Sequence, residues 1–287
     1  MSEWHYGGQA LLEGVMIRGR TAMAIAVRNP EGEIVLHDEQ LPDAGKSWKT
    51  WPFFRGIFGL WDTLNLGMRA LNYSANVALG ESEYQVGPAQ MAGVVAVSLV
   101  FAVALFFVTP LLLVQLIRQN VAVPWVQVVL EGLIRIGILL LYFVAVSQMR
   151  DIQRVFAYHG AEHKAVNALE GGAELDVASV RPFPTAHTRC GTAFLLLVVA
   201  LSIPLFVPFG GLPFIWRLLS RIALVPVLAS ISYEIMRLGA NHFERPAVRL
   251  LLAPALLLQR LSTRQPDDDM IEVAIAALKR AVELDTA

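Results

Sequence analysis

Two histidines and a glutamate stand close together in residues 158–164, which spell YHGAEHK. If this segment is helical, His159 and His163 are one turn apart and ~40° apart around the axis, so both imidazoles leave the same face. Glu162 lies beside them. This is the HxxEH arrangement, in which two histidines hold a divalent metal and the carboxylate takes a proton from an activated water molecule. The pattern predicts His159 and His163 as metal ligands and Glu162 as a catalytic base.

A second pair of metal-binding residue types follows along the chain. His187 and Cys190 are three residues apart, and this spacing also allows both side chains to bind one metal ion. The four ligands fall within 32 positions of a chain that has six His and one Cys in 287 residues. We predict that they meet at one metal. The alternative is that the histidines cap helices or bond to carbonyls at a membrane surface, with Cys190 a small buried hydrophobe.

The number of ligands separates two kinds of metal site. A zinc hydrolase keeps one coordination position open and therefore uses three protein ligands. If all four His and Cys side chains bind, the site is closed and only fixes the fold. If only the two histidines of the HxxEH segment bind, Glu234 is a candidate third ligand, and its alternative role is to pair with Arg237 or to end its helix. Imidazole and thiolate favour zinc, with iron and cobalt as alternatives.

The composition is that of a membrane protein. Hydrophobic residues make up 55% of the chain, charged residues only 16%, and the mean hydropathy is +0.53, whereas soluble domains carry about a quarter charged residues. A net charge of -1 argues against nucleic acid as a partner. One cysteine cannot form an internal disulfide, which fits a reducing compartment. The first residues have neither a basic nor an apolar segment, so we expect no cleaved signal peptide.

Long uncharged runs predict about four transmembrane helices. Residues 91–117 are uncharged and long enough to cross the hydrocarbon core. Residues 124–146 form the second predicted span. This span carries Glu131 and Arg135 one turn apart, where the two charges can neutralise each other on one helix face. We interpret the pair as a structural bridge that faces the bundle, and the wall of a substrate path is the alternative.

The third and fourth predicted spans lie after the histidine segment. Residues 191–216 are uncharged and supply the third span. Residues 222–233 are too short for a full crossing, at ~18 Å of helix. This fourth span must therefore also include residues 213–221. We expect the side chains of Arg217 and Arg221 to extend outward to the membrane surface.

The remaining segments are predicted to lie outside the hydrocarbon core. Residues 21–28 and 33–38 flank a turn-forming Asn-Pro-Glu-Gly sequence, which predicts a β-hairpin. Residues 51–79 are amphipathic and rich in aromatic side chains, so we expect a helix in the membrane interface; packing on the hairpin is the alternative. Residues 250–258 are too short to cross and are expected at the interface. Residues 267–284 begin with three aspartates and predict an amphipathic helix.

These elements predict a mainly α, polytopic membrane protein with a small N-terminal hairpin and helix region. Nineteen Lys and Arg residues lie on one side of the predicted spans and three on the other. This positive-inside bias predicts a multi-pass protein of the cytoplasmic (inner) membrane with both termini in the cytoplasm. The predicted divisions are an N-terminal region 1–83, a membrane domain 84–260 with the cytoplasmic His/Cys loop 147–191, and a C-terminal helix 261–287.

Several short blocks resemble one protein family. They are GGQA at 7–10, EGVM at 13–16, HGAEHK at 159–164 and RCGT at 189–192, with PDD at 266–268. Together they are similar to the YqhQ-like bacterial membrane proteins. The resemblance covers most of the chain and implies a multi-pass membrane protein and a predicted metal-dependent enzyme. The ligand positions that it implies are His159, Glu162 and His163.

Two functions follow from these observations. The first is a membrane-embedded, metal-dependent hydrolase that acts at the cytoplasmic face on an amide or ester of a membrane-associated protein or lipid. The alternative is a non-catalytic membrane scaffold or assembly factor in which the metal is structural. A transporter is a third hypothesis, but one self-paired charge couple supplies little of an ion path unless the protein forms an oligomer.

Overall fold

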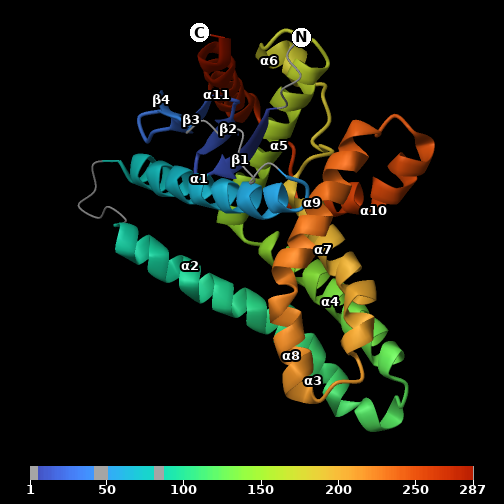
Figure 1. Cartoon of the computed structure of the whole chain (residues 1–287). Coiled ribbons are helices and arrows are strands. Elements are labelled where there is room, and N and C mark those ends of the chain that lie inside the picture. The colour runs from blue at the N-terminus through green and yellow to red at the C-terminus, as the bar shows by residue number, and fades with distance from the viewer. Residues whose placement is uncertain (1–5, 42–50, 81–86, 287) are drawn as a thin grey trace.

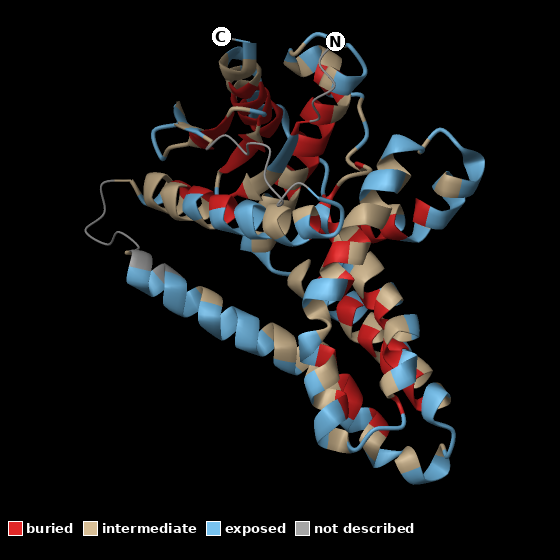
Figure 2. Cartoon of the chain, in the orientation of Figure 1, coloured by how far each residue is buried: buried red, intermediate tan, exposed pale blue. Residues whose placement is uncertain are grey.

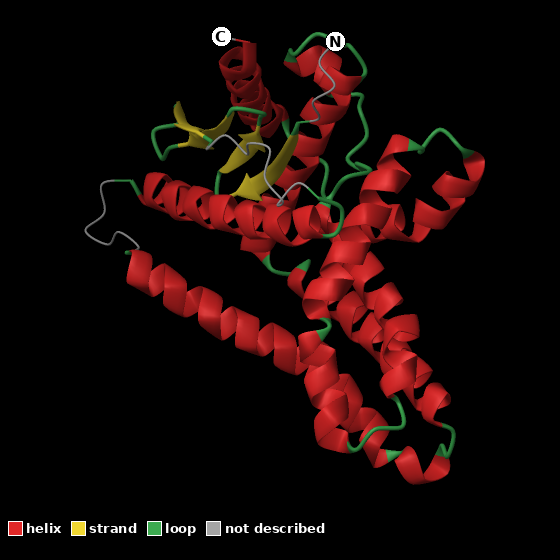
Figure 3. Ribbon diagram, viewed as in Figure 1, coloured by secondary structure: helices red, strands yellow, loops and turns green. Residues whose placement is uncertain are grey.

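The computed structural model describes residues 6–41, 51–80 and 87–286. Two expectations lie outside these residues: the N-terminal end, where no signal peptide is expected, and the boundary between 83 and 84. The described chain is mainly helical, with a small antiparallel sheet at one end (Figure 3). In Figure 1 the sheet and the C-terminal helix lie at the end opposite α3 and α8.

The sheet has four antiparallel strands in the order β1 (Gly7–Leu11), β2 (Gly14–Arg18), β3 (Ala22–Arg28) and β4 (Ile34–Gln40). The expected hairpin is confirmed by β3 and β4, which pair from Arg28 opposite Ile34. Its turn is closed by a hydrogen bond from Gly32 N–H to the Asn29 carbonyl, and Gly32 has φ +88°, which glycine adopts readily. The hairpin of β1 and β2 was not predicted, because its glycine-rich sequence lacks the usual strand composition.

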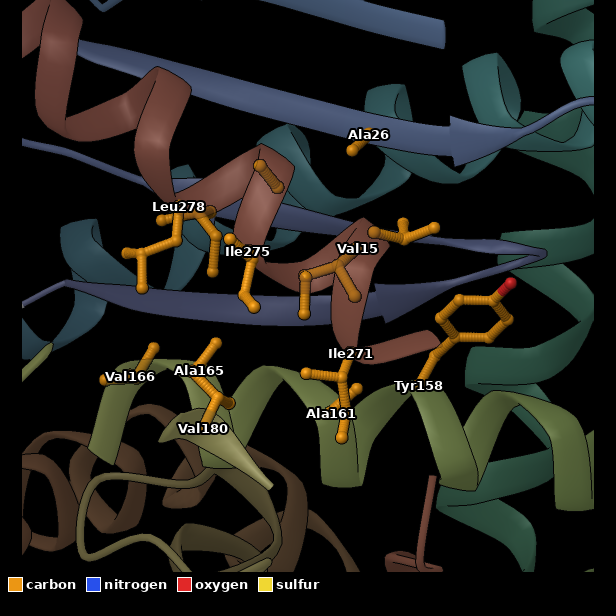
Figure 4. Close-up of a cluster of buried hydrophobic side chains, with 14 of the residues drawn as sticks. Val15, Ala26, Tyr158, Ala161, Ala165, Val166, Val180, Ile271, Ile275 and Leu278 are labelled. Atoms are coloured by element: carbon orange, nitrogen blue, oxygen red, sulfur yellow. The ribbon is translucent and has the colours of Figure 1, made fainter. Parts of the chain in front are cut away.

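The two faces of the sheet carry two separate apolar clusters. One face packs on helices α5 (Arg150–Glu170) and α11 (Asp268–Thr286), where Val15 and Ala26 meet Ala161 and Ile271 (Figure 4). Neighbouring strand residues point the other way, because successive side chains alternate between faces. The sheet unit therefore joins the start, the middle and the end of the chain, and Figure 2 shows its buried residues gathered there.

Helix α1 (Phe54–Leu79) covers the second face of the sheet. Leu66 and Ala70 pack there against an apolar cluster that includes Met16 and Ile25. Packing on the hairpin was the alternative expectation for this segment, and the structure shows that contact. The aromatic side chains at the start of the helix, among them Phe54 and Trp61, remain exposed.

Within the described part of the chain, three helical stretches are long and apolar enough to cross a membrane: Ala92–Leu116, Pro124–Val146 and Gly191–Phe209. The first stretch comprises α2 (Pro88–Val103), the π-helical segment η2 (Ala104–Val108) and α3 (Thr109–Leu116). The second stretch is α4 (Pro124–Val146). The third comprises α7 (Gly191–Phe206) and η4 (Val207–Phe209). These stretches agree with the first three predicted spans. Helices α8 (Phe214–Ala223) and α9 (Val225–Asn241) form a fourth candidate, bent by 43°.

The expectation that Arg217 and Arg221 extend outward is wrong. Their exposed fractions are 1% and 0%. The Arg221 guanidinium bonds to both carboxylate oxygens of Glu131, at 3.0 and 2.8 Å. Glu131 also accepts a hydrogen bond from Arg135 at 2.7 Å, as expected from their spacing. Inside the bundle Arg221 therefore pairs with a carboxylate, and Arg217 bonds to the side chains of Gln115 and Gln127, where exposure to water was predicted for both.

The C-terminal part returns to the sheet unit. Residues 250–258 lie in α10 (Pro246–Ser262), which is not among the candidate spans and contains Pro254. The predicted last helix is α11, whose first turn is capped by a hydrogen bond from Met270 N–H to the Asp267 carboxylate at 2.9 Å. Two short helical segments, η3 (Arg118–Asn120) and α6 (Val177–Val180), complete the elements of the described chain.

The end of α11 is fastened to the turn between β2 and β3. The carboxylate of Asp285 accepts hydrogen bonds from the backbone N–H groups of Arg20 at 2.7 Å and Thr21 at 2.8 Å, and from the Thr21 hydroxyl at 2.8 Å. Burial raises the pKa of this carboxyl, but the hydrogen bonds to its charged form outweigh burial, so the pKa lies below its ordinary value of 3.8.

We predict that Asp285→Asn lowers the free energy of unfolding by about 1 kcal/mol at pH 7, because it removes charge-assisted hydrogen bonds. The lowered pKa means that this stabilisation is complete above 3.8 and is lost as the pH falls through the folded-state pKa. Thermal unfolding of the protein in detergent at pH 7 and at decreasing pH measures the difference. Asp62→Asn, on the exposed side of α1, is the matched control. Equal Tm values for the two variants at pH 7 would contradict the prediction.

Candidate metal centre

Helix α5 places His159 and His163 on one face. The helix carries Asp151 in its first turn, where an acidic side chain favours the positive helix end, and it ends before Gly172, which has φ +71°. The two imidazole rings have centroids 4.3 Å apart. The opposite face of the helix is apolar and packs on the sheet, which fixes the direction in which the histidines point.

Cys190 comes to the same point from the start of α7. It is the residue that precedes the helix, with an extended backbone, and its side chain is buried. The Cys190 Sγ lies 3.3 Å from the His159 Nε2. One ligand atom from each of His159, His163 and Cys190 lies within 4.8 Å of the others. The structure therefore brings three of the predicted ligands together.

Backbone carbonyls orient both imidazoles. The Nδ1 of His159 is 2.8 Å from the Ser262 carbonyl oxygen, and the Nδ1 of His163 is 2.5 Å from the Thr185 carbonyl oxygen. A carbonyl can only accept a hydrogen bond, so each Nδ1 carries the proton. In the neutral ring the Nε2 then holds a free lone pair. Metal-binding histidines are commonly held in this way by a carbonyl on the far ring nitrogen.

Glu162 lies at the edge of the cluster and is almost fully buried. A carboxylate oxygen of Glu162 is 3.5 Å from the Nε2 of His163, and the exposed fraction of the residue is 2%. Strand β1 passes directly over it, because a Cβ added to Gly8 would lie 2.7 Å from the Glu162 Cγ. A glycine at position 8 thus leaves room for this side chain. The carboxylate is beside the candidate ligands without being needed to complete the group of three.

His187 stands next to the cluster but is not one of its three members. Its ring centroid is 5.6 Å from that of His163. Its buried Nε2 lies 3.6 Å from a carboxylate oxygen of Glu170 and makes no hydrogen bond among the described residues. Burial lowers the pKa of His187, and the nearby Glu162 raises it by less. The Gln259 side chain bonds to both the N–H and the carbonyl of His187, each at 2.9 Å. The two bonds to Gln259 therefore hold the His187 backbone, and with it the ring, close to the site.

Glu234 lies elsewhere in the structure. Its carboxylate bonds to the guanidinium of Arg55, at 2.7 Å from Nε, and accepts a hydrogen bond from the backbone of Phe53 at 3.2 Å. This ion pair joins α9 to α1. Glu234 is not in the group of candidate ligands, and its partner is Arg55 rather than the Arg237 considered from the sequence.

Two side chains that the sequence analysis did not single out hold the loop before Cys190. The Lys164 ammonium donates to the carbonyls of Arg181 at 2.7 Å and Phe183 at 2.6 Å. The Asn167 amide donates to the carbonyls of Pro184 and Ala186. Burial lowers the pKa of Lys164. Their position was the available sequence signal, because Lys164 directly follows His163 and Asn167 lies one helical turn after His163.

Comparison with known proteins identifies the family. The family described as "Protein of unknown function (DUF1385)" matches residues 51–284. The chain belongs to this family. It is also 32% identical over 302 aligned residues to "Uncharacterized protein YqhQ" of Bacillus subtilis (strain 168), an alignment that covers 98% of this chain and 93% of that protein. This confirms the resemblance to YqhQ-like proteins. No solved structure matches the chain significantly.

Helix α5 approaches the backbone that follows α10 very closely at Gly160. A Cβ added to Gly160 would lie 2.1 Å from the Arg264 carbonyl oxygen, two residues beyond the carbonyl that orients His159. We predict that Gly160→Ala lowers the free energy of unfolding by about 1–3 kcal/mol, because the added methyl group forces the backbone at Arg264 to move. Thermal unfolding in detergent measures it.

Gly137→Ala is the control, since a Cβ there meets nothing within 4 Å. We expect this variant, in the interior of α4, to be as stable as the parent protein or slightly more stable. The close packing of α5 would be contradicted if both alanine variants unfolded at the same temperature.

Proposed function

We propose that this chain is a multi-pass protein of the cytoplasmic membrane that binds one divalent metal, with zinc favoured, through His159, His163 and Cys190 and uses it for hydrolysis. The observation that carries the proposal is the convergence of these three ligand atoms within 4.8 Å. Two of the groups come from one helix and the third from another element, 27 residues further along the sequence. The exposed apolar faces of the candidate spans support insertion into a bilayer.

The charge distribution supports an orientation. Nineteen Lys and Arg residues belong to the segments on the side of the spans that carries the sheet and α5, and three belong to the opposite end of the bundle. Under the positive-inside rule, the sheet, the metal centre and both termini face the cytoplasm. The site then lies where the candidate spans leave the membrane, because Cys190 directly precedes α7.

The donor set fits zinc. Two imidazoles with free Nε2 lone pairs and one thiol match the His and Cys ligands that zinc prefers, and they are unlike the oxygen ligands of magnesium or calcium. Three protein ligands are also the number found in catalytic zinc sites. When bound, the ion supplies Lewis-acid chemistry that polarises a carbonyl and makes water more acidic.

Glu162 is the residue that we assign to proton transfer. Its carboxylate oxygen lies 3.5 Å from the His163 Nε2, so it borders the space where a carbonyl substrate and the attacking water would meet. In this role the carboxylate accepts the proton of the water and later donates it to the leaving group. The β1 backbone above Glu162 and the burial of His163 limit access of bulk water.

The substrate class follows from this chemistry and from the location. A general base beside a Lewis acid suits the hydrolysis of an amide or an ester. A site at the level where helices enter the membrane suits a substrate that is itself bound to the bilayer. We therefore propose a membrane-associated protein or lipid as the substrate.

A structural metal site is the second candidate function, and burial favours it. Glu162, His163 and Cys190 have exposed fractions of 2%, 1% and 5%, and a metal there would tie α5 to α7. His187 lies close by, with its Nε2 3.6 Å from a Glu170 carboxylate oxygen, and as a fourth ligand it would close the coordination. In that case the protein is a membrane scaffold or assembly factor.

The variant Glu162→Gln separates the two functions. We predict that it keeps the metal, because the three ligands remain, and lowers the rate of hydrolysis at least about 100-fold, because an amide cannot accept the proton. The full-length protein in detergent is assayed for zinc by mass spectrometry and for hydrolysis with nitrophenyl esters and fluorogenic peptides. Cys190→Ser is the control that should lose metal. If Glu162→Gln retained both metal and the full rate, the catalytic role of Glu162 would be excluded.

A further inference from the structure

A group of buried charges lies in the candidate spans, far from the metal centre. Glu131 on α4 is contacted by Arg135 from its own helix and by Arg221 from α8. Arg135 also donates to the Phe106 carbonyl in the π-helical segment and to the Ser202 hydroxyl. Arg221 lies over the ring of Phe206, at 4.5 Å from its centroid. The hydrogen-bonding groups of these two arginines are well occupied.

Arg217, one helical turn from Arg221, is less well satisfied. Its exposed fraction is 1%, yet its Nε has no hydrogen-bond partner among the described residues. One terminal nitrogen donates to the Gln115 side chain at 2.5 Å, and the other reaches Gln127 only at 3.5 Å. A guanidinium has five N–H donors, so much of its capacity remains open. Both partners are neutral amides, and neither offsets its charge.

The balance of charge in this group is positive. Arg135 and Arg221 both bond to the single carboxylate of Glu131, whereas the nearby Arg217 bonds only to the amides of Gln115 and Gln127. A buried charge without a counter-charge is strongly unfavourable in a low-dielectric environment, and such residues in membrane segments are commonly tied to function. An anion bound at Arg217 would supply the missing counter-charge. The planar guanidinium fork matches phosphate oxygens in particular.

The position of Arg217 indicates where the anion comes from. Gln115 is the next-to-last residue of α3, and Gln127 lies in the first turn of α4, so Arg217 sits at the ends of the candidate spans. Trp125 and Trp216 are exposed beside these residues. Tryptophan gathers at the level of the lipid headgroups. Arg217 therefore lies at the depth of lipid phosphates, in the leaflet opposite the metal centre.

We propose that Arg217, with Gln115 and Gln127, binds the phosphate of an anionic phospholipid. The site rests on the proposed membrane placement but is independent of the proposed metal and hydrolysis. Because Arg217 is 1% exposed, the phosphate must displace the side chains that cover it. It then accepts hydrogen bonds from the Arg217 Nε and from the terminal nitrogen that now reaches Gln127 weakly. The lipid thereby neutralises part of the excess charge and ties α3, α4 and α8 together at one end of the bundle.

Thermal unfolding of the full-length protein in a neutral detergent tests this site. Three additions are compared at equal ionic strength: dioleoyl phosphatidylglycerol, dioleoyl phosphatidylcholine, and inorganic phosphate. We expect phosphatidylglycerol to raise Tm by at least about 3 °C, as a ligand specific to the folded state does, and the other two to have no such effect. A rise in Tm with inorganic phosphate and not with phosphatidylglycerol would overturn the proposal that the phosphate belongs to a lipid. Equal rises in Tm with both lipids would overturn the proposal that the site selects an anionic headgroup.

Arg217→Gln should abolish the phosphatidylglycerol shift, and Arg217→Lys should retain only part of it, because the charge stays and the fork is lost. Arg260→Gln, at an exposed arginine of α10, is the control that keeps the full shift. An undiminished shift in Arg217→Gln overturns the proposal. If that variant does not fold, phosphorus analysis of the parent protein decides: at least one phosphatidylglycerol retained per chain supports the site, and none overturns it.

Zinc content measured on the same samples keeps the two proposals apart. Protein that holds zinc but shows no lipid shift removes the lipid site and leaves the metal centre in place. Protein that shows the Arg217-dependent rise in Tm but holds no zinc supports the lipid site and removes the metal centre. Extraction of the chain from cells without detergent would remove the membrane placement on which the lipid site depends.

Discussion

The hydrogen bonds between two imidazoles and two backbone carbonyls are the constraint on which the candidate site depends. Each bond fixes the proton on Nδ1, leaves a lone pair on Nε2, and aims that lone pair at the neighbourhood of Cys190. The carbonyls belong to Ser262 and Thr185, on two segments that are distant in sequence. The site therefore forms only when the end of α10 and the loop before α7 are both seated against α5.

Other contacts hold those carbonyls in place. The Lys164 and Asn167 side chains fasten the loop to α5, and Gln259 fastens His187 to α10. On its opposite side α5 packs against the sheet together with α11. The sheet unit thus supports the site on one side, and Cys190 reaches the site from the start of the candidate span α7. This arrangement explains why a chain with so many apolar helices also contains a small sheet built from its beginning and covered by its end.

The sequence predicted the features that depend on local spacing. The common face of His159 and His163 follows from helical periodicity, and the uncharged runs indicate the first three candidate spans. Long-range pairings could not be predicted in the same way. Glu234 pairs with Arg55, 179 residues away, and the burial of Arg221 depends on Glu131, 90 residues away. A charged residue near a short apolar run is compatible with exposure or with an internal partner, and only the packing of the helices decides between them.

The same reasoning explains what was missed at the candidate site. A glycine-rich segment gives no strand signal, so the strand that lies over Glu162 was not predicted, although Gly8 is what allows it to pass so closely. The carbonyls of Thr185 and Ser262 carry no sequence signature at all, because every residue has one. Ligand types can be found in a sequence, whereas the groups that orient them come from the backbone of the folded chain.

The central claim is that one metal ion is held by His159, His163 and Cys190. X-ray absorption spectroscopy at the zinc edge, on full-length protein purified in detergent with one zinc per chain, tests it most directly. The structure predicts one sulfur ligand at about 2.3 Å and two imidazole nitrogens at about 2.0 Å, with the sulfur lost in Cys190→Ser. A coordination shell without sulfur, or one unchanged by that substitution, would contradict the account.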